Sequence, residues 1–122
     1  MRTVTDRLVT AKEVAVIQWL LDHAAVGDVA EYRRRPVEEL RVVGECDCGC
    51  SSLFFSTEKG ITRRVADATA VYPDGQEADL MLWGREDEIV WLEVIPHDSR
   101  LPHCAPEIAN LRTWEQRGLE LL

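Results

Sequence analysis

The sequence is short of positive charge and has no long hydrophobic run. Lysine and arginine number 14 against 22 aspartate and glutamate residues, so the formal net charge is −8 at pH 7. This excess repels both a phosphate backbone and an anionic membrane surface, and neither nucleic acid nor a membrane is therefore an expected partner. The longest apolar run, Ile89 to Ile95, is interrupted by Glu93 and is much shorter than a membrane span.

The opening stretch MRTVTDRLVTAKE also lacks the apolar segment of a secretory signal. We therefore expect a cytoplasmic, reducing location, in which the four cysteines would not form structural disulfides. The one basic run, Arg33 to Arg35, precedes Pro36 and is interpreted as a solvated linker. The whole sequence is 46% hydrophobic and 30% charged, a mixture typical of a globular fold, and we expect a single domain over residues 1–122.

Two helices are expected, one near each end of the chain. Thr10 and Glu13 fit a capping box, and apolar residues then recur at helical spacing as far as a stop at Gly27. The second helix is expected to begin near Pro106, which suits a first turn, and to end at Gly118.

The middle of the chain is predicted to form strands. Short β-branched and aromatic runs are separated by turn residues at Asp47–Ser51, at Pro73–Gly75 and at Glu86-Asp87. The expected fold is α+β, with an N-terminal helix, an antiparallel β-meander of about five strands, and a C-terminal helix packed on the sheet.

Counting outward from the last two turns predicts a register. If each turn has two central residues, Leu80 lies opposite Glu93 and Leu82 lies opposite Trp91. Both faces of the sheet would then be mostly apolar, and two helices would not cover them. This register predicts a homodimer through the sheet or its edge, with Trp83 and Trp91 as interface candidates.

Three cysteines, Cys46, Cys48 and Cys50, alternate with other residues in the stretch ECDCGC. With Cys104 or His103 they would supply the ligands of a tetrahedral zinc site. Structural zinc sites usually take paired cysteines two residues apart, and alternate cysteines of an extended strand would lie about 7 Å from each other. The favoured prediction is a hairpin turn without a metal, and the alternative is a metal-binding protein that uses these cysteines.

Two other groups are candidates for a small enzyme. His97, next to Asp98, would serve as the base for a Cys104 nucleophile if the fold brought them together. Glu93 lies among apolar residues, where burial would raise the pKa of its carboxyl. No catalytic motif surrounds His97, which we predict to be a solvated loop residue. Acids are seldom fully buried, so we predict that Glu93 is structural, at the sheet rim and either exposed or paired with Arg63 or Arg64.

Three segments, LRVVGECDCGCSSLFF, YPDGQ and WLEVIPHDSRLP, resemble a family of small uncharacterised bacterial proteins with a domain of unknown function. The shared pattern is a C-x-C-G-C turn between two strands and a late strand that runs into a loop. The resemblance covers Leu40 to Pro102 and implies a fold but no catalytic role.

The function predicted from these features is that of a non-enzymatic, acidic, cytoplasmic binding protein of an immunity-type or regulatory kind. Acidic single-domain proteins can bind basic partners with the help of electrostatic steering. The expected partner is a protein or a second copy of the chain, and no cofactor is expected. The alternatives are metal binding by the cysteines and catalysis by Glu93 or His97.

Overall fold

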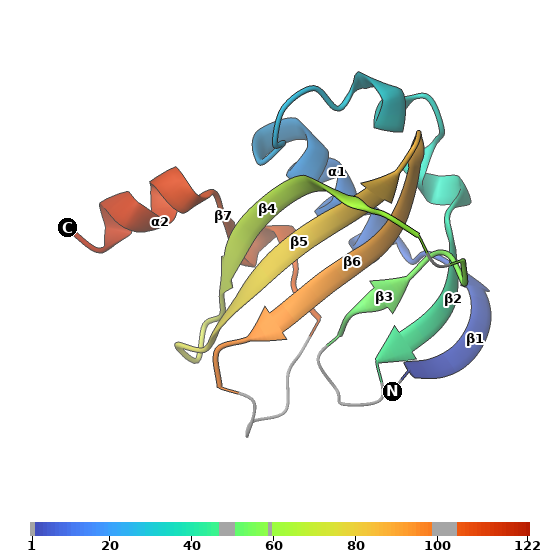
Figure 1. Cartoon of the computed structure of the whole chain (residues 1–122). Helices are drawn as coiled ribbons and strands as arrows, with labels where there is room; N and C mark the ends of the chain where they lie inside the picture. Colours follow the sequence, from blue (N-terminus) through green and yellow to red (C-terminus); the bar gives the residue numbers. More distant parts are fainter. Residues whose placement is uncertain (1, 47–50, 59, 99–104) are drawn as a thin grey trace.

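The computed structural model describes residues 2–46, 51–58, 60–98 and 105–122, and within them seven strands form one antiparallel sheet with two α-helices (Figure 1). The strands are β1 (Arg2–Leu8), β2 (Arg41–Cys46), β3 (Leu53–Phe54), β4 (Arg63–Val71), β5 (Glu77–Arg85), β6 (Glu88–Pro96) and β7 (Leu111–Arg112). The helices are α1 (Ala11–His23) and α2 (Trp114–Glu120), with short 3-10 turns η1 (Ala30–Arg33), η2 (Val37–Glu39) and η3 (Ile108–Asn110).

The strands lie in the order β1-β2-β3-β6-β5-β4-β7. Sequence neighbours pair within β1-β2-β3 and within β4-β5-β6, but β3 also pairs with β6, so the two groups join into one sheet. The α+β class is confirmed, whereas the predicted meander of about five strands is corrected to seven strands with a crossover. The two unpredicted strands, β1 and β7, lie at the edges of the sheet.

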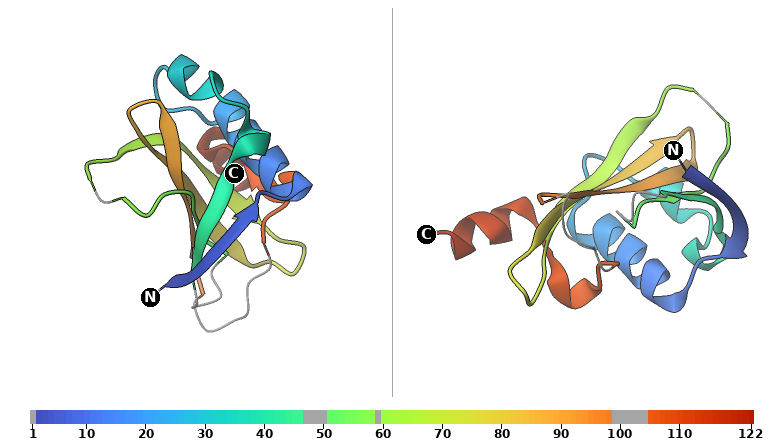
Figure 2. Two further views of the ribbon diagram at one scale, coloured as in Figure 1. Left: turned by 90° about the vertical axis from the view of Figure 1, so that its right-hand side faces the viewer. Right: turned by 90° about the horizontal axis from the view of Figure 1, so that it is seen from below.

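Helix α1 begins where the capping box predicts. The Thr10 hydroxyl accepts a hydrogen bond from the Glu13 backbone N–H at 3.2 Å, and the Glu13 carboxylate accepts one from the Thr10 N–H at 2.8 Å. The helix ends at His23, before the predicted stop at Gly27. Its inner side chains join a single core cluster with those of β4, β5 and β6, and Figure 2 shows the helix on one face of the sheet: Val16, Ile17, Leu20 and Leu21.

Strand β5 alternates between a buried and a half-buried face, which is the pattern of a sheet covered on one side. Its buried residues pair with buried residues of β6, as in Leu80 with Val94 and Leu82 with Leu92. The predicted register of these strands is therefore wrong by one residue, and the half-buried Met81 pairs with Glu93 instead.

The error in register comes from a β-bulge. Arg85 pairs with Glu88, so the turn has the two central residues that the sequence predicts. Between the pairs Trp83 with Trp91 and Gly84 with Ile89, however, β6 contains one extra residue. A shift of one residue moves every following side chain to the other face. Leu80, Leu82, Leu92 and Val94, which the prediction divided between two faces, are thus gathered on the side of α1.

Helix α2 is shorter than predicted and begins at Trp114, well after Pro106. None of its residues is buried, and in Figure 1 it extends away from the sheet. Trp114 Nε1 donates a hydrogen bond to Asp67 of β4 at 3.1 Å, and Arg117 pairs with Glu77 of β5 at 2.7 Å. The structure shows contact at one margin of the sheet and does not confirm a helix packed over it.

Glu13 connects α1 to the first two strands. Arg7 of β1 donates to both carboxylate oxygens of Glu13, at 2.8 and 2.9 Å, and also to Glu45 of β2 at 2.8 Å. Burial acts to raise the pKa of Glu13, but the hydrogen bonds from Arg7 and Thr10 outweigh it and hold that pKa below its ordinary value.

We expect Glu13→Gln to lower the free energy of unfolding by about 1 kcal/mol at neutral pH, since it weakens both a helix cap and an ion pair. A lowered folded-state pKa means that the carboxylate stabilises the fold above the unfolded value of about 4.3, and that this contribution disappears as the pH falls through the folded value. In urea unfolding, the difference in the free energy of unfolding between the wild type and Glu13→Gln should therefore become smaller below about pH 4. Glu39→Gln, at an exposed position, is the control. A difference in the free energy of unfolding that stays constant as the pH falls below about 4 would contradict the stabilising role of the ionised Glu13 carboxylate.

Candidate functional site

The face of the sheet opposite α1 carries a row of stacked aromatic rings. Trp83 and Trp91 are cross-strand partners whose ring centroids lie 6.0 Å apart, and Phe54 of β3 stacks on Trp91 at 5.6 Å. Further residues of β5 and β6 continue this face. We call the group the uncovered sheet face, and its members are Phe54, Asp79, Met81, Trp83, Trp91, Glu93 and Ile95.

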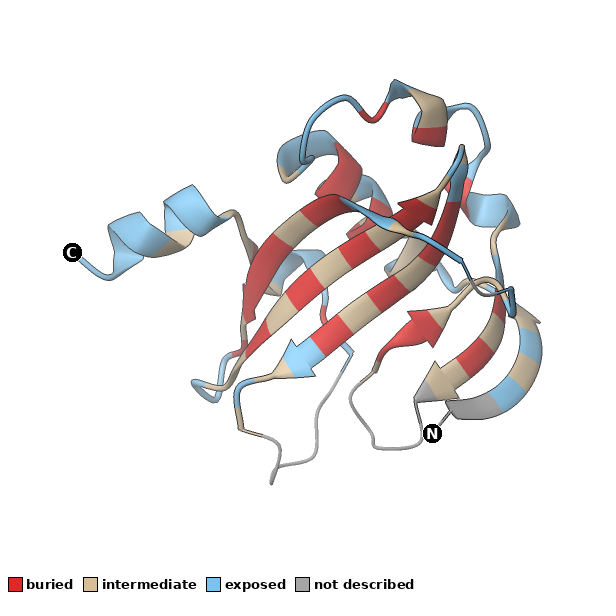
Figure 3. Cartoon of the chain, in the orientation of Figure 1, coloured by how far each residue is buried: buried red, intermediate tan, exposed pale blue. Residues whose placement is uncertain are grey.

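Within the described residues, no helix lies over this face. Figure 1 looks onto it, with α1 behind the strands. The segment between β3 and β4 crosses near one end, where Arg85 donates to Ser56 at 3.1 Å and pairs with Glu58 at 3.3 Å. Most of the side chains are half-buried, as the alternating stripes of Figure 3 show, and Ile95 is 40% exposed. An apolar face that is bordered by polar residues and lacks a covering layer is typical of a binding surface.

Acidic side chains share this side of the sheet, and most of them are paired. Asp67 lies 3.4 Å from Arg64, and Asp79 lies 2.8 Å from His97 Nε2. Glu93 differs, because it accepts a hydrogen bond from Trp83 Nε1 at 3.1 Å and forms no ion pair within the residues that the structure describes. Its carboxylate is therefore a half-buried negative charge beside aromatic rings, without a counter-ion there.

The two alternative candidates for a small enzyme, His97 and Glu93, have different partners. His97 interacts with Asp79, and Glu93 interacts with Trp83. Four residues of extended chain separate them, which corresponds to about 13 Å. Neither arginine suggested as a partner of Glu93 pairs with it: Arg63 donates to the Tyr32 hydroxyl at 2.9 Å, and Arg64 pairs with Asp67.

The cysteine predictions fall mainly on residues 47–50 and 99–104, which are outside the described part of the chain. The strands on either side, β2 and β3, are paired antiparallel as predicted, with Glu45 opposite Leu53. Among the described residues, no group of three histidine, cysteine or acidic side chains is placed to hold a metal. The hairpin turn and the zinc alternative both stay predictions.

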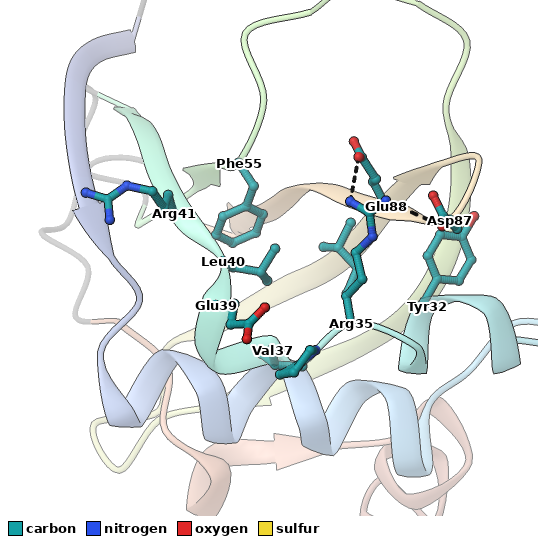
Figure 4. Close-up of a pocket in the computed structure, with 11 residues that line it drawn as sticks. Tyr32, Arg35, Val37, Glu39, Leu40, Arg41, Phe55, Asp87 and Glu88 are labelled. Carbon is teal, nitrogen blue, oxygen red and sulfur yellow. Dashed lines mark hydrogen bonds and ion pairs between the residues drawn. The ribbon is translucent and has the colours of Figure 1, made fainter.

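A separate cavity of about 260 Å³ lies between η1, η2 and the start of β6 (Figure 4). Arg35 points into it and pairs with Glu88 at 2.7 Å and with Asp87 at 3.6 Å. Arg33 is likewise paired with Asp22 at 2.7 Å. Two arginines of the basic run are therefore neutralised by acids of the same chain, which favours a structural role for them over ligand binding.

Comparison with known protein families, with curated proteins and with solved structures gives no match. The resemblance of the cysteine-containing segments to a bacterial family therefore stays a prediction, and the site is interpreted from its own geometry. No helix in the described ranges is long and apolar enough to cross a membrane.

Sequence analysis named Trp83, Trp91 and Glu93 as candidates but not the other members of the uncovered sheet face, among them Phe54 and Met81. Phe54 reaches it only through the pairing of β3 with β6, strands that are distant in the sequence. Because the bulge in β6 was not recognised, the predicted register placed Met81 opposite Leu92, which is in fact buried. The strict alternation along β5 was the available signal for Met81.

Proposed function

We propose that this chain is a non-catalytic binding protein of an immunity-type or regulatory kind, and that it docks a basic protein on the uncovered sheet face. The observation that carries the proposal is the stacked row of Phe54, Trp91 and Trp83 on a face that no helix of the described residues covers. Tryptophan is enriched among the residues that dominate binding energies, because it buries a large area with few rotatable bonds.

Charge complementarity indicates a basic partner. The chain carries a formal net charge of −8, which steers cationic surfaces toward it. On the uncovered sheet face itself, Glu93 is without a basic partner in the described part of the chain, whereas the other acid, Asp79, is already paired with His97. A lysine or arginine of a docked protein would supply the missing charge.

A second copy of the chain is the other possible occupant. The observed register leaves one open face, so the argument for dimerisation from two apolar faces no longer holds. In a symmetric pair through this face, the acidic residues of the two copies would also approach one another, which is unfavourable. We therefore favour a basic partner over self-association.

The docking of a basic protein on the uncovered sheet face is tested with a tetra-arginine peptide as the probe and with a lysine substitution on that face. Met81→Lys puts a positive charge at the centre of the uncovered sheet face and should weaken peptide binding, measured by calorimetry, by about tenfold or more. Ile108→Lys adds the same charge on η3, where the side chain is 48% exposed, and should weaken binding by less than about twofold.

Sedimentation at micromolar concentration separates the two occupants. The proposal predicts a monomer that binds the peptide. A dimer that is lost in Met81→Lys would assign the face to a second copy instead. Equal weakening by the two lysine variants, or no peptide binding at low salt, would show that the proposed docking face is wrong.

A further inference from the structure

We infer that Glu93, together with Trp83 and Trp91, forms the anchoring site for an arginine side chain of the docked protein. The inference rests on the proposed function and names the chemistry that the partner presents. It replaces the expectation that Glu93 is a purely structural residue. The three side chains come from two neighbouring strands, β5 and β6, and lie on one face of the sheet.

The carboxylate is oriented before any partner arrives. Trp83 Nε1 donates to Oε1 of Glu93 at 3.1 Å, which fixes one oxygen and leaves Oε2 without a hydrogen bond in the described residues. A carboxylate held in this way loses less side-chain freedom when a cation binds. Glu93 also follows Trp91 by two residues on the same strand, so the Trp91 indole lies beside it, and Trp83 lies diagonally across from it on β5.

The other acids on this side of the sheet are already engaged. Asp67 accepts from Trp114 and pairs with Arg64, and Asp79 is held by His97. Glu77 pairs with Arg117 of α2 at 2.7 Å. An incoming cation would have to displace a partner at each of these positions, whereas at Glu93 it would displace none that the described residues supply.

An arginine side chain fits a site made of a carboxylate and two indoles better than a lysine side chain does. Its guanidinium is planar and weakly hydrated, so it can stack on an indole while it donates to a carboxylate, whereas the lysine ammonium is a strongly hydrated point charge. The chain contains the same combination internally, because the Arg63 guanidinium lies 5.0 Å from the centre of the Tyr32 ring and 3.3 Å from the Glu31 carboxylate.

The indole of Trp91 gives a second indication that this row is not arranged for stability alone. Its Nε1 is buried and has no hydrogen-bond partner in the described structure. A buried donor without an acceptor costs about 1–3 kcal/mol and is rare in a settled core. A tryptophan that carries this cost at the surface of the sheet fits a role in binding better than a role in stability.

The test compares tetra-arginine with tetra-lysine, which carry the same charge. In NMR spectra of nitrogen-15-labelled protein, the resonance of the Trp83 indole N–H reports on the site directly, because this group donates a hydrogen bond to Glu93. We expect tetra-arginine to shift this resonance and to bind the wild-type protein about threefold or more tighter than tetra-lysine. Glu93→Gln should weaken tetra-arginine binding by about fivefold and remove the preference for arginine, while Glu39→Gln, with the same loss of charge on η2, should leave both unchanged.

The outcomes separate this inference from the proposed function. Equal affinity of the two peptides for the wild-type protein overturns the arginine site, and this comparison does not depend on any variant folding. Tetra-arginine binding that is weakened by Met81→Lys but is unaffected by Glu93→Gln leaves the docking face in place and removes the anchor. Absence of binding to both peptides overturns both proposals.

Discussion

Replacing Gly84 by alanine is expected to lower the free energy of unfolding by about 3 kcal/mol, at the upper end of the cost of overpacking a core. A Cβ built at this position would lie 2.5 Å from Cε1 and 2.7 Å from Cζ of Tyr32, far inside van der Waals contact. The tyrosine has little room to move, because it is 2% exposed and its hydroxyl accepts a hydrogen bond from Arg63 at 2.9 Å.

Thermal unfolding measures this effect, and for a chain of this size the midpoint should fall by about 10 °C. Gly118→Ala is the matched control, since nothing lies within 4 Å of its added Cβ, and it should be neutral or slightly stabilising. Combining Gly84→Ala with Tyr32→Leu should recover part of the loss, because the two changes share one contact. A midpoint for Gly84→Ala within about 2 °C of wild type would contradict the packing of η1 on β5.

Two neighbouring residues of β5 are expected to show opposite phenotypes. Leu82 is fully buried beneath α1, and Leu82→Ala should cost about 2–5 kcal/mol of stability while leaving peptide affinity of the folded protein unchanged. Trp83 points to the uncovered sheet face, and Trp83→Ala should weaken tetra-arginine binding by about thirtyfold, the size of an interface hot spot.

Calorimetric titration and urea unfolding of both variants measure the two effects side by side. The smaller loss of stability is expected for Trp83→Ala, because this side chain is only half-buried. If Leu82→Ala impairs binding as much as Trp83→Ala does, then the two faces of β5 do not have the separate roles assigned here.

The parts of the fold that the sequence predicts well are those that depend on a few adjacent residues. Thr10 and Glu13 satisfy each other within one helical turn, and the two-residue turn at Glu86-Asp87 is likewise local. Both were predictable because their physical cause lies within four residues of sequence.

The parts that sequence reasoning missed depend on distant segments or on one extra residue. The bulge in β6 changes the register without any glycine or proline in the bulged segment of β6 itself to mark it. Strand β1 was not expected because its residues are largely polar, and at the edge of the sheet Val4 is 86% exposed. The bulge also determines that Glu93 and Trp83 lie on the same face of the sheet. The hydrogen bond between them could therefore not be derived from the sequence.

The central claim is that a basic protein docks on the uncovered sheet face, and a map of amide chemical shifts during titration with tetra-arginine tests it most directly. The account predicts that the largest shifts fall on β5 and β6, at residues such as Met81, Trp83 and Glu93, while the α1 residues Val16 and Leu20 on the opposite side stay unchanged. Shifts centred on the Arg35 cavity, or spread evenly over the acidic surface, would contradict it.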